Sequence, residues 1–307
     1  MQKLRTVFFG TSEFGLPALE WLFQNTDLQA VITTPDKPSG RKQELIPSPV
    51  KQWAERNNIR LLQPDDLKDE VFQNVLRDLD PEVAIVASYG KIIPQKVLDI
   101  PKYKSLNLHP SLLPKYRGAT PVQNAILNGD KITGTTLMLM DDKMDHGPIL
   151  AQKKYDIWPK TTYPQLHEEL GKLSAEVLAE NWEEYVKGEL TPQPQDEAKA
   201  IYVKLLTKED GKIDWKKEAS EIERQIRAFT PWPGTYTVSG EDTIKIFKAQ
   251  ISDKKLVPGE TLIENKKLFV GTASSALEIL ELQMPGGKRL TAEQFLTGFR
   301  GELKFNA

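Results

Sequence analysis

Residues 83–118 read VAIVASYGKIIPQKVLDIPKYKSLNLHPSLLPKYRG, and two short apolar runs in this stretch decide the fold. The runs Val83 to Ala87 and Ser105 to Leu108 are predicted to be strands of a buried sheet. Pro110 follows His109 and ends the second strand. Open α/β sheets bind ligands at the carboxyl ends of their strands, so Asn107 and His109 are placed at a candidate binding edge.

The same alternation of apolar runs and amphipathic stretches extends through the first half of the chain. Further strands are predicted at Arg5 to Phe9, Leu28 to Ile32 and Thr135 to Met140. Helices are predicted at Leu16 to Phe23, Val50 to Asn57, Val71 to Leu79 and Val122 to Leu127. This βαβα order predicts an α/β fold with a Rossmann-like, mainly parallel sheet that is covered on both faces.

A second, smaller domain is predicted in the last third of the chain. A long helix at roughly Pro164 to Lys187 precedes the polar, proline-containing stretch GELTPQPQD at residues 188–196. Beyond it, a helix near Ala219 to Phe229 is followed by short β-like runs separated by turns, which is typical of a small barrel. We expect an N-terminal domain at 1–188, a linker at 189–206 and a C-terminal domain at 207–307.

Composition excludes several classes of function. The chain has no cysteine, which rules out disulfides, thiol nucleophiles and thiolate metal sites, and its three histidines argue against a histidine-rich metal centre. The formal net charge of -2 argues against a strongly basic nucleic-acid binder but allows local basic patches. No apolar run approaches the roughly 20 residues of a membrane span, and no targeting segment opens the chain. We therefore expect a cytoplasmic protein with no membrane partner.

Three polar residues form a candidate site for acyl transfer. Asn107 and His109 lie two apart on a predicted strand, so their side chains point to the same face. Asp145 precedes Gly147 in a predicted turn, and by itself it would be equally consistent with a turn aspartate. An amide, an imidazole and a carboxylate together could take a proton from an amine and hold a developing oxyanion.

The stretch Ser111 to Gly118 after Asn107-x-His109 resembles the signature of enzymes that use 10-formyltetrahydrofolate. The flanking residues, TPVQNAIL at 120–127 and GTTLMLMD at 134–141, are most similar to the methionyl-tRNA formyltransferase family, and the resemblance extends nearly end to end. It implies that Asn107, His109 and Asp145 are the catalytic trio. It also implies a C-terminal domain that is an OB-like β-barrel and binds tRNA.

The same resemblance implies a folate pocket made of two segments. One is the proline-flanked edge Ser111, Leu112, Leu113 and Pro114. The other follows the strand at 83–87 and contributes Ser88, Tyr89, Gly90 and Ile92, which could also be read as a simple strand-to-loop exit.

A long proline-rich loop at residues 34–49 resembles the family's basic insertion that contacts the tRNA acceptor end. Lys37, Arg41 and Lys42 are its available phosphate partners. This chain has Gln43 and Glu44 where many relatives carry lysines, which reduces the positive charge of the loop.

The resemblance to the methionyl-tRNA formyltransferase family implies formyl transfer from 10-formyltetrahydrofolate to the α-amino group of methionyl initiator tRNA, with tetrahydrofolate as product. We expect a monomer that needs no metal. The alternative is a formyltransferase acting on a small amine such as an amino sugar nucleotide, because such enzymes would share the trio. An RNA-binding module without catalysis is disfavoured by the intact trio. A dinucleotide-dependent oxidoreductase is disfavoured because GTSEFG at residues 10–15 lacks the second glycine of the fingerprint.

Overall fold

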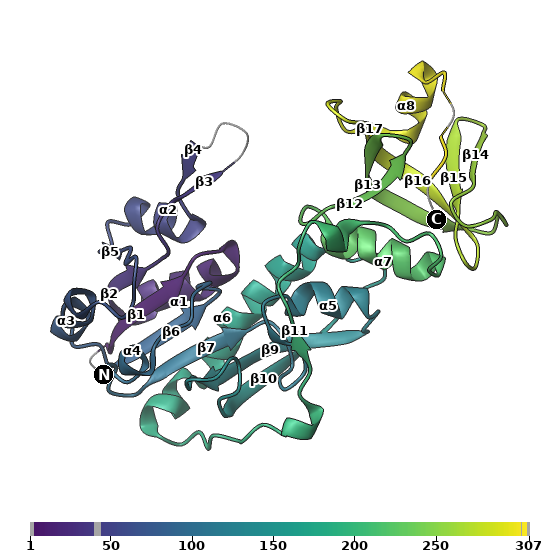
Figure 1. Cartoon of the computed structure of the whole chain (residues 1–307). Helices are drawn as coiled ribbons and strands as arrows, with labels where there is room; N and C mark the ends of the chain where they lie inside the picture. Colours follow the sequence, from purple (N-terminus) through teal and green to yellow (C-terminus); the bar gives the residue numbers. More distant parts are fainter. Residues whose placement is uncertain (1–2, 40–43, 302, 306–307) are drawn as a thin grey trace. The chain divides into compact units, whose positions relative to one another are not determined.

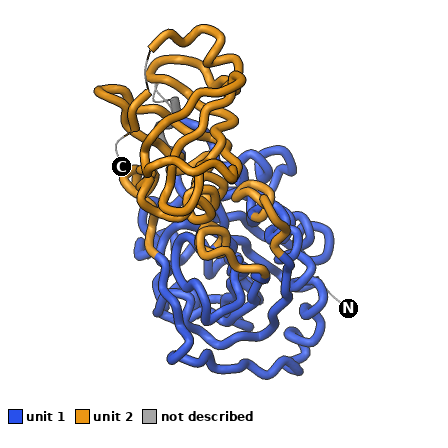
Figure 2. The backbone as a smooth tube through the Cα atoms, turned by 90° about the vertical axis from the view of Figure 1, so that its right-hand side faces the viewer, with its two compact units in different colours: residues 1–121, 132–156, 167–203 blue, residues 122–131, 157–166, 204–307 orange. Residues whose placement is uncertain are grey.

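The computed structural model describes residues 3–39, 44–301 and 303–305. The chain divides into two compact units, drawn in blue and orange in Figure 2. Unit 1 contains residues 1–121, 132–156 and 167–203, and unit 2 contains residues 122–131, 157–166 and 204–307. Each unit is therefore assembled from segments that are separated along the sequence.

Unit 1 is built on a seven-stranded sheet with the strand order β10-β9-β7-β6-β1-β2-β5. Its strands are β1 (Arg5–Gly10), β2 (Asp27–Ile32), β5 (Leu61–Leu62), β6 (Val83–Ala87), β7 (Ser105–His109), β9 (Ile132–Leu139) and β10 (Ile149–Asp156). The first five strands pair in parallel, whereas β9 is antiparallel to β7 and β10 is antiparallel to β9. The predicted mainly parallel sheet is confirmed (Figure 1).

Helices form at all five places where the sequence predicts them in this part of the chain, and two short helices, η1 and α4, are additional. They are the short η1 (Glu13–Gly15), α1 (Leu16–Asn25), α2 (Pro49–Arg56), α3 (Glu70–Asp78), α4 (Gln95–Leu98), α5 (Pro121–Leu127) and α6 (Tyr163–Lys187). Ser48 and Asp69 cap α2 and α3 by accepting hydrogen bonds from backbone N–H groups of the first turn. Alternate β1 residues Val7 and Phe9 pack with Phe72 of α3 in one apolar cluster. This packing fixes the register of β1 against its covering helix.

Several strands of unit 1 were not predicted, including the two-residue β5. The hairpin β3 (Lys37–Ser39) and β4 (Glu44–Ile46) lies in the proline-rich loop. The edge strand β10 alternates half-buried and exposed residues and contains two lysines, so it has no continuous apolar run. An edge strand needs only one buried face, so its sequence contains polar residues and lacks the continuous apolar run that predicts a buried strand.

Unit 2 contains the predicted smaller β domain. Its antiparallel sheet consists of β12 (Thr235–Ser239), β13 (Asp242–Ser252), β14 (Thr261–Glu264), β15 (Lys267–Gly271), β16 (Ala276–Gln283) and β17 (Leu290–Thr291). It is joined by α7 (Ala219–Phe229), α8 (Ala292–Gly298) and a turn, η3 (Glu209–Gly211). The fully buried Trp215 stacks on Phe305 and donates its indole N–H to Thr237 Oγ1 at 2.9 Å. A buried tryptophan satisfied in this way anchors the core of the unit.

The polar segment after α6 is paired with unit 1 as far as Val203. Gln193 forms a backbone bridge with Ile149, and β11 (Tyr202–Val203) pairs in parallel with β8 (Arg117–Gly118). A short turn, η2 (Glu197–Lys199), lies between these two contacts. The segment is therefore hydrogen-bonded to the rest of unit 1 at both ends, with one short turn between.

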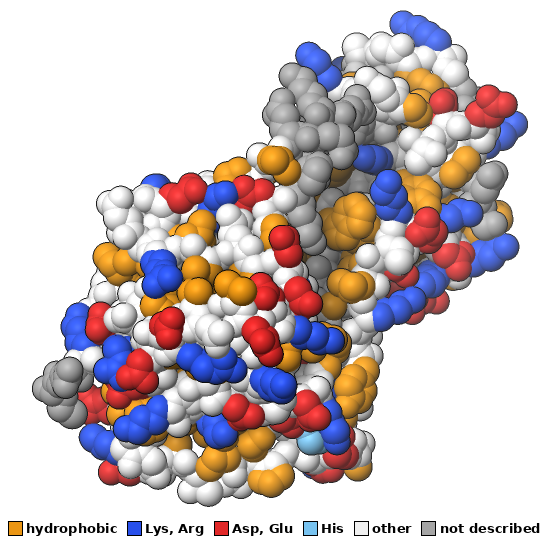
Figure 3. All heavy atoms as spheres, turned by 60° about the vertical axis from the view of Figure 1, so that its left-hand side comes forward, with side chains coloured by type: hydrophobic (Ala, Val, Ile, Leu, Met, Phe, Trp, Pro, Cys, Tyr) orange, Lys and Arg blue, Asp and Glu red, His pale blue; other side chains and the backbone are white. Residues whose placement is uncertain are grey.

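The surface charge and the apolarity of the helices also bear on the sequence-based expectations. Basic and acidic side chains are interspersed on the face drawn in Figure 3, in agreement with the small net charge. Among the helices in the described ranges, none combines the length and the apolarity that crossing a membrane requires.

Candidate active site

The central strand β7 carries the first two site residues at its carboxyl end. Asn107 pairs with Val86 of β6 and Met138 of β9, and His109 pairs with Thr136 of β9. Both side chains are largely buried, with exposed fractions of 9% for Asn107 and 4% for His109. The sheet therefore fixes both side chains on a rigid element, as their spacing in the sequence predicted.

Asp145 reaches the same place from the loop between β9 and β10. Its Oδ1 lies 3.4 Å from Asn107 Nδ2 and 3.6 Å from His109 Nδ1, and its Oδ2 accepts a 2.7 Å hydrogen bond from the backbone N–H of Gly118. Asp145 itself has φ +50°, a left-handed conformation that costs a non-glycine residue of order 1–3 kcal/mol. The structure thus brings the three predicted residues together, with Asp145 held in a strained backbone.

The second ring nitrogen of His109 is also engaged. His109 Nε2 lies 2.9 Å from the carbonyl oxygen of Tyr116. A carbonyl can only accept, so Nε2 carries a proton and donates it to Tyr116. In the neutral ring, Nδ1 is then the basic nitrogen, and it faces the carboxylate of Asp145.

Side chains of the neighbouring strands hold the segment Ser111 to Pro114 through hydrogen bonds to its backbone. Ser111 and Leu113 are buried, and Thr136 Oγ1 donates to Ser111 O at 2.6 Å and accepts from Leu113 N at 3.1 Å. Gln152 Nε2 donates to Leu113 O at 2.9 Å. The side chains of Leu112 and Pro114 are half-buried, so they are the members of this segment that keep surface for a ligand.

The segment after β6 splits into exposed residues and one core residue. Ser88, Gly90 and Ile92 are exposed, whereas Tyr89 is 2% exposed and packs edge-to-face on Phe9. Within the described residues the Tyr89 hydroxyl has no hydrogen-bond partner, and burial raises the pKa of Tyr89 to about 12. The backbone carbonyl of Tyr89 accepts from Thr11 Oγ1 at 2.8 Å.

Of the three residues predicted to contact tRNA, the structure describes one. Lys37 begins β3, where its backbone pairs with Ile46. Arg41 and Lys42 lie outside the described residues.

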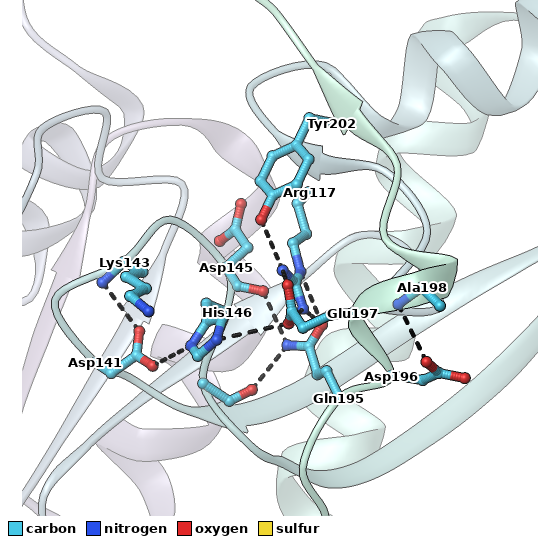
Figure 4. A network of polar contacts seen from close by, with 11 residues as sticks. Arg117, Asp141, Lys143, Asp145, His146, Gln195, Asp196, Glu197, Ala198 and Tyr202 are labelled. Carbon is cyan, nitrogen blue, oxygen red and sulfur yellow. Dashed lines mark hydrogen bonds and ion pairs between the residues drawn. The ribbon is translucent and has the colours of Figure 1, made fainter.

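Four residues near the trio were not predicted as site residues. Figure 4 shows Arg117, Gln195, Glu197 and Tyr202 joined by hydrogen bonds beside Asp145. Arg117 belongs to the motif that carries the resemblance, which was a usable signal. The other three lie about eighty residues away along the chain in a stretch that reads as a linker, and no local pattern marks them.

His146, next to Asp145, is half-buried at the rim of the site. Its Nδ1 lies 2.6 Å from Asp141 Oδ2, and its Nε2 lies 3.5 Å from Glu197 Oε1. In the part of the chain that the structure describes, no group of three or more His, Asp or Glu side chains is arranged to hold a metal ion.

Comparison with known proteins identifies relatives of the whole chain. The sequence model described as Formyl transferase matches residues 4–181, and the one described as Formyl transferase, C-terminal domain, matches residues 205–300. The methionyl-tRNA formyltransferase of Geobacter metallireducens is 40% identical over 304 residues, which are 98% of each chain. That of Chloroflexus aurantiacus is 42% identical over 304 residues, which are 97% of this chain and 98% of the relative.

Two solved structures share the fold at low sequence identity. HypX from Aquifex aeolicus in complex with tetrahydrofolic acid is 18% identical with a TM-score of 0.66, over 99% of this chain and 50% of that chain. An N-formyltransferase from Helicobacter canadensis, in complex with folinic acid and dTDP-3-aminofucose, is 19% identical with a TM-score of 0.65, over 94% of this chain and 100% of that one. The full-length matches at 40% identity and above are the ones that decide the family: the chain belongs to the methionyl-tRNA formyltransferases.

Proposed function

We propose that this protein transfers the formyl group of 10-formyltetrahydrofolate to the α-amino group of methionine esterified to initiator tRNA. The observation that carries the proposal is the convergence of Asn107, His109 and Asp145 at the carboxyl edge of the sheet, in a chain matched end to end by methionyl-tRNA formyltransferases. Full-length similarity supports this substrate over a small amine.

The reaction needs a neutral amine and a stabilised oxyanion. The α-amino group has a reference pKa of roughly 7.7, so near neutral pH much of it is already nucleophilic and must mainly be oriented. Its nitrogen attacks the formyl carbon and forms a new C–N bond. The bond from that carbon to N10 of the folate then breaks, and the proton lost by the amine ends on N10.

His109 and Asp145 fit the proton transfer in this sequence. With Nε2–H held by Tyr116 O, Nδ1 is the nitrogen that can take the proton of the attacking amine. The adjacent carboxylate of Asp145 stabilises the imidazolium that forms. The geometry supports Tyr116 O as the group that holds His109 in this tautomer.

Asn107 fits the oxyanion. Its amide has two N–H groups, and only one of them is directed at Asp145, at a long 3.4 Å. The other can donate to the formyl oxygen as negative charge develops there. A donor on a rigid strand stabilises this charge without reorganising during the reaction.

Folate binding is assigned to the two segments that border this edge. Leu112 and Pro114 offer apolar surface, and Ser88, Gly90 and Ile92 are exposed beside them along the sheet edge. Ser111, Leu113 and Tyr89 belong to the same pocket through their backbone and packing. The binding of tetrahydrofolic acid by a solved neighbour of this fold supports the assignment.

RNA binding is assigned to the hairpin loop with Lys37, Arg41 and Lys42 and to the C-terminal domain. In this proposal residues 1–188 form the catalytic domain, 189–206 the connection and 207–307 the tRNA-binding domain. The protein acts as a cytoplasmic monomer.

The test is transfer of a labelled formyl group from 10-formyltetrahydrofolate to three acceptors: methionyl initiator tRNA, methionyl elongator tRNA and a free amino sugar nucleotide. We expect transfer to the initiator tRNA alone. Transfer to the amino sugar nucleotide in preference to either tRNA would replace this proposal with the small-amine alternative.

A further inference from the structure

The side-chain amide of Gln195 connects two parts of unit 1 that are about fifty residues apart in the sequence. Its Nε2 donates to the backbone carbonyls of Asp145 at 2.8 Å and Gly147 at 2.7 Å. Its Oε1 accepts from Arg117 Nε at 3.0 Å and Nη2 at 2.8 Å. A carboxamide has two N–H groups and two acceptor lone pairs, so every hydrogen-bonding position of Gln195 is used (Figure 4).

Arg117 fixes the orientation of this amide. Its side chain is fully buried, and its remaining N–H groups bond to Glu197 at 3.0 and 2.6 Å and to the Tyr202 hydroxyl at 2.7 Å. All five guanidinium N–H groups are thus satisfied, as a buried charge requires. Because a guanidinium has only donors, the oxygen of Gln195 must face it and the NH₂ group must face the loop of Asp145.

The loop that Gln195 contacts has a constrained backbone. Asp145 is left-handed, and a Cβ on Gly147 would lie 1.9 Å from Leu139 O, so the backbone of the loop is pressed against β9. Gly118, next to Arg117, donates its N–H to the carboxylate of Asp145 at 2.7 Å. The loop is therefore hydrogen-bonded in two ways: Gly118 binds the side chain of Asp145, and Gln195 binds the backbone carbonyls of Asp145 and Gly147.

We propose that Gln195 is a positioning residue for Asp145, holding residues 145–147 so that the carboxylate faces Asn107 and His109. This inference rests on the catalytic role proposed for Asp145. It gives the segment that reads as a linker a task in the chemistry, because removing its amide donors would release the carboxylate without touching any substrate.

The variant Gln195→Glu tests this at almost constant size. The new side chain still accepts from Arg117, but it replaces two N–H donors with a carboxylate oxygen that faces two carbonyls. We expect kcat for formylation of methionyl initiator tRNA to fall at least tenfold, because a misplacement of about 1 Å can cost up to about 10²-fold. The KM values for tRNA and folate should change less than twofold.

The matched control is Gln193→Glu, which makes the same change of charge two residues away. The Gln193 side chain is exposed, and among the described residues its side-chain amide donates only to Thr191 O, at 3.3 Å. We expect its kcat to equal that of wild type. Gln195→Ala, which places no charge near the loop, is the second variant, and it should lower kcat in the same direction at a near-native melting temperature.

A double-mutant cycle separates positioning from general damage. In the Asp145→Asn background, Gln195→Glu should cost less than about twofold, because the carboxylate it positions is gone. Equal fold-losses in both backgrounds, or wild-type kcat in both Gln195 variants, would overturn the inference. If wild type itself fails to formylate methionyl initiator tRNA, the proposed function is refuted, which is a distinct outcome.

Discussion

The charge of Asp145 should supply a large part of the rate, and Asp145→Asn isolates it. Asparagine keeps the size of the side chain and can still accept from the N–H of Gly118, so the loop is retained. What is lost is the attraction between the carboxylate and protonated His109, whose Nδ1 lies 3.6 Å from Asp145 Oδ1. At an effective dielectric constant of about 20, that attraction is about 4 to 5 kcal/mol.

This energy corresponds to a factor of about 10³, and it is an upper limit because water and nearby dipoles replace part of the lost charge. We therefore expect the rate constant of formyl transfer to fall by about 10²- to 10³-fold. It is measured in single-turnover reactions with enzyme in excess over methionyl-tRNA. Folate affinity, measured by equilibrium titration, should be unchanged. Asp142→Asn, in the same loop at an exposed position, is the control and should retain wild-type turnover. Turnover of Asp145→Asn within twofold of wild type would remove Asp145 from the mechanism.

Three further outcomes are expected. Tyr89→Phe removes a buried hydroxyl that has no hydrogen-bond partner among the described residues. The free energy of unfolding, measured by urea titration, should therefore rise by about 1 kcal/mol. A fall of similar size in the free energy of unfolding would reveal a hidden partner. Burial lowers the pKa of the His167 imidazole below 6.5, so the folded state binds a proton on this ring less tightly than the unfolded chain does. The free energy of unfolding therefore falls as the pH drops through 6.5. The melting temperature of His167→Gln should fall less between pH 7.5 and 5.5 than that of wild type. Replacing Arg41 and Lys42 with alanine should raise the KM for tRNA and flatten its salt dependence while sparing the KM for folate, and equal salt slopes would show that the loop does not touch RNA.

The sheet could be predicted from the sequence because its central strands are buried on both faces and their apolar runs are continuous. Val83 to Ala87 is fully buried in the structure, as the run indicates. The edge strand β10 escaped prediction because it alternates half-buried and exposed residues and carries two adjacent lysines, so it has no continuous apolar run. The hairpin at 37–46 escaped because three-residue strands leave no periodicity to detect.

The candidate site also has a part that local sequence could predict and a part that it could not. That Asn107 and His109 share a face follows from the two-residue period of a strand, which is a local property. That Asp145 joins them had to come from resemblance, because a left-handed residue in a turn has no local signature that tells a site from an ordinary turn.

By itself the sequence determined the fold class and the family, and it proposed the chemical groups of the candidate site, because these follow from local periodicity and from resemblance along the chain. Only the tertiary structure decided which neighbours hold those groups. Tyr116 O selects the tautomer of His109, and Gln195 grips the loop of Asp145 from about fifty residues away. Such contacts are made by backbone carbonyls and by side chains distant in the chain, and they exist only after the chain has folded.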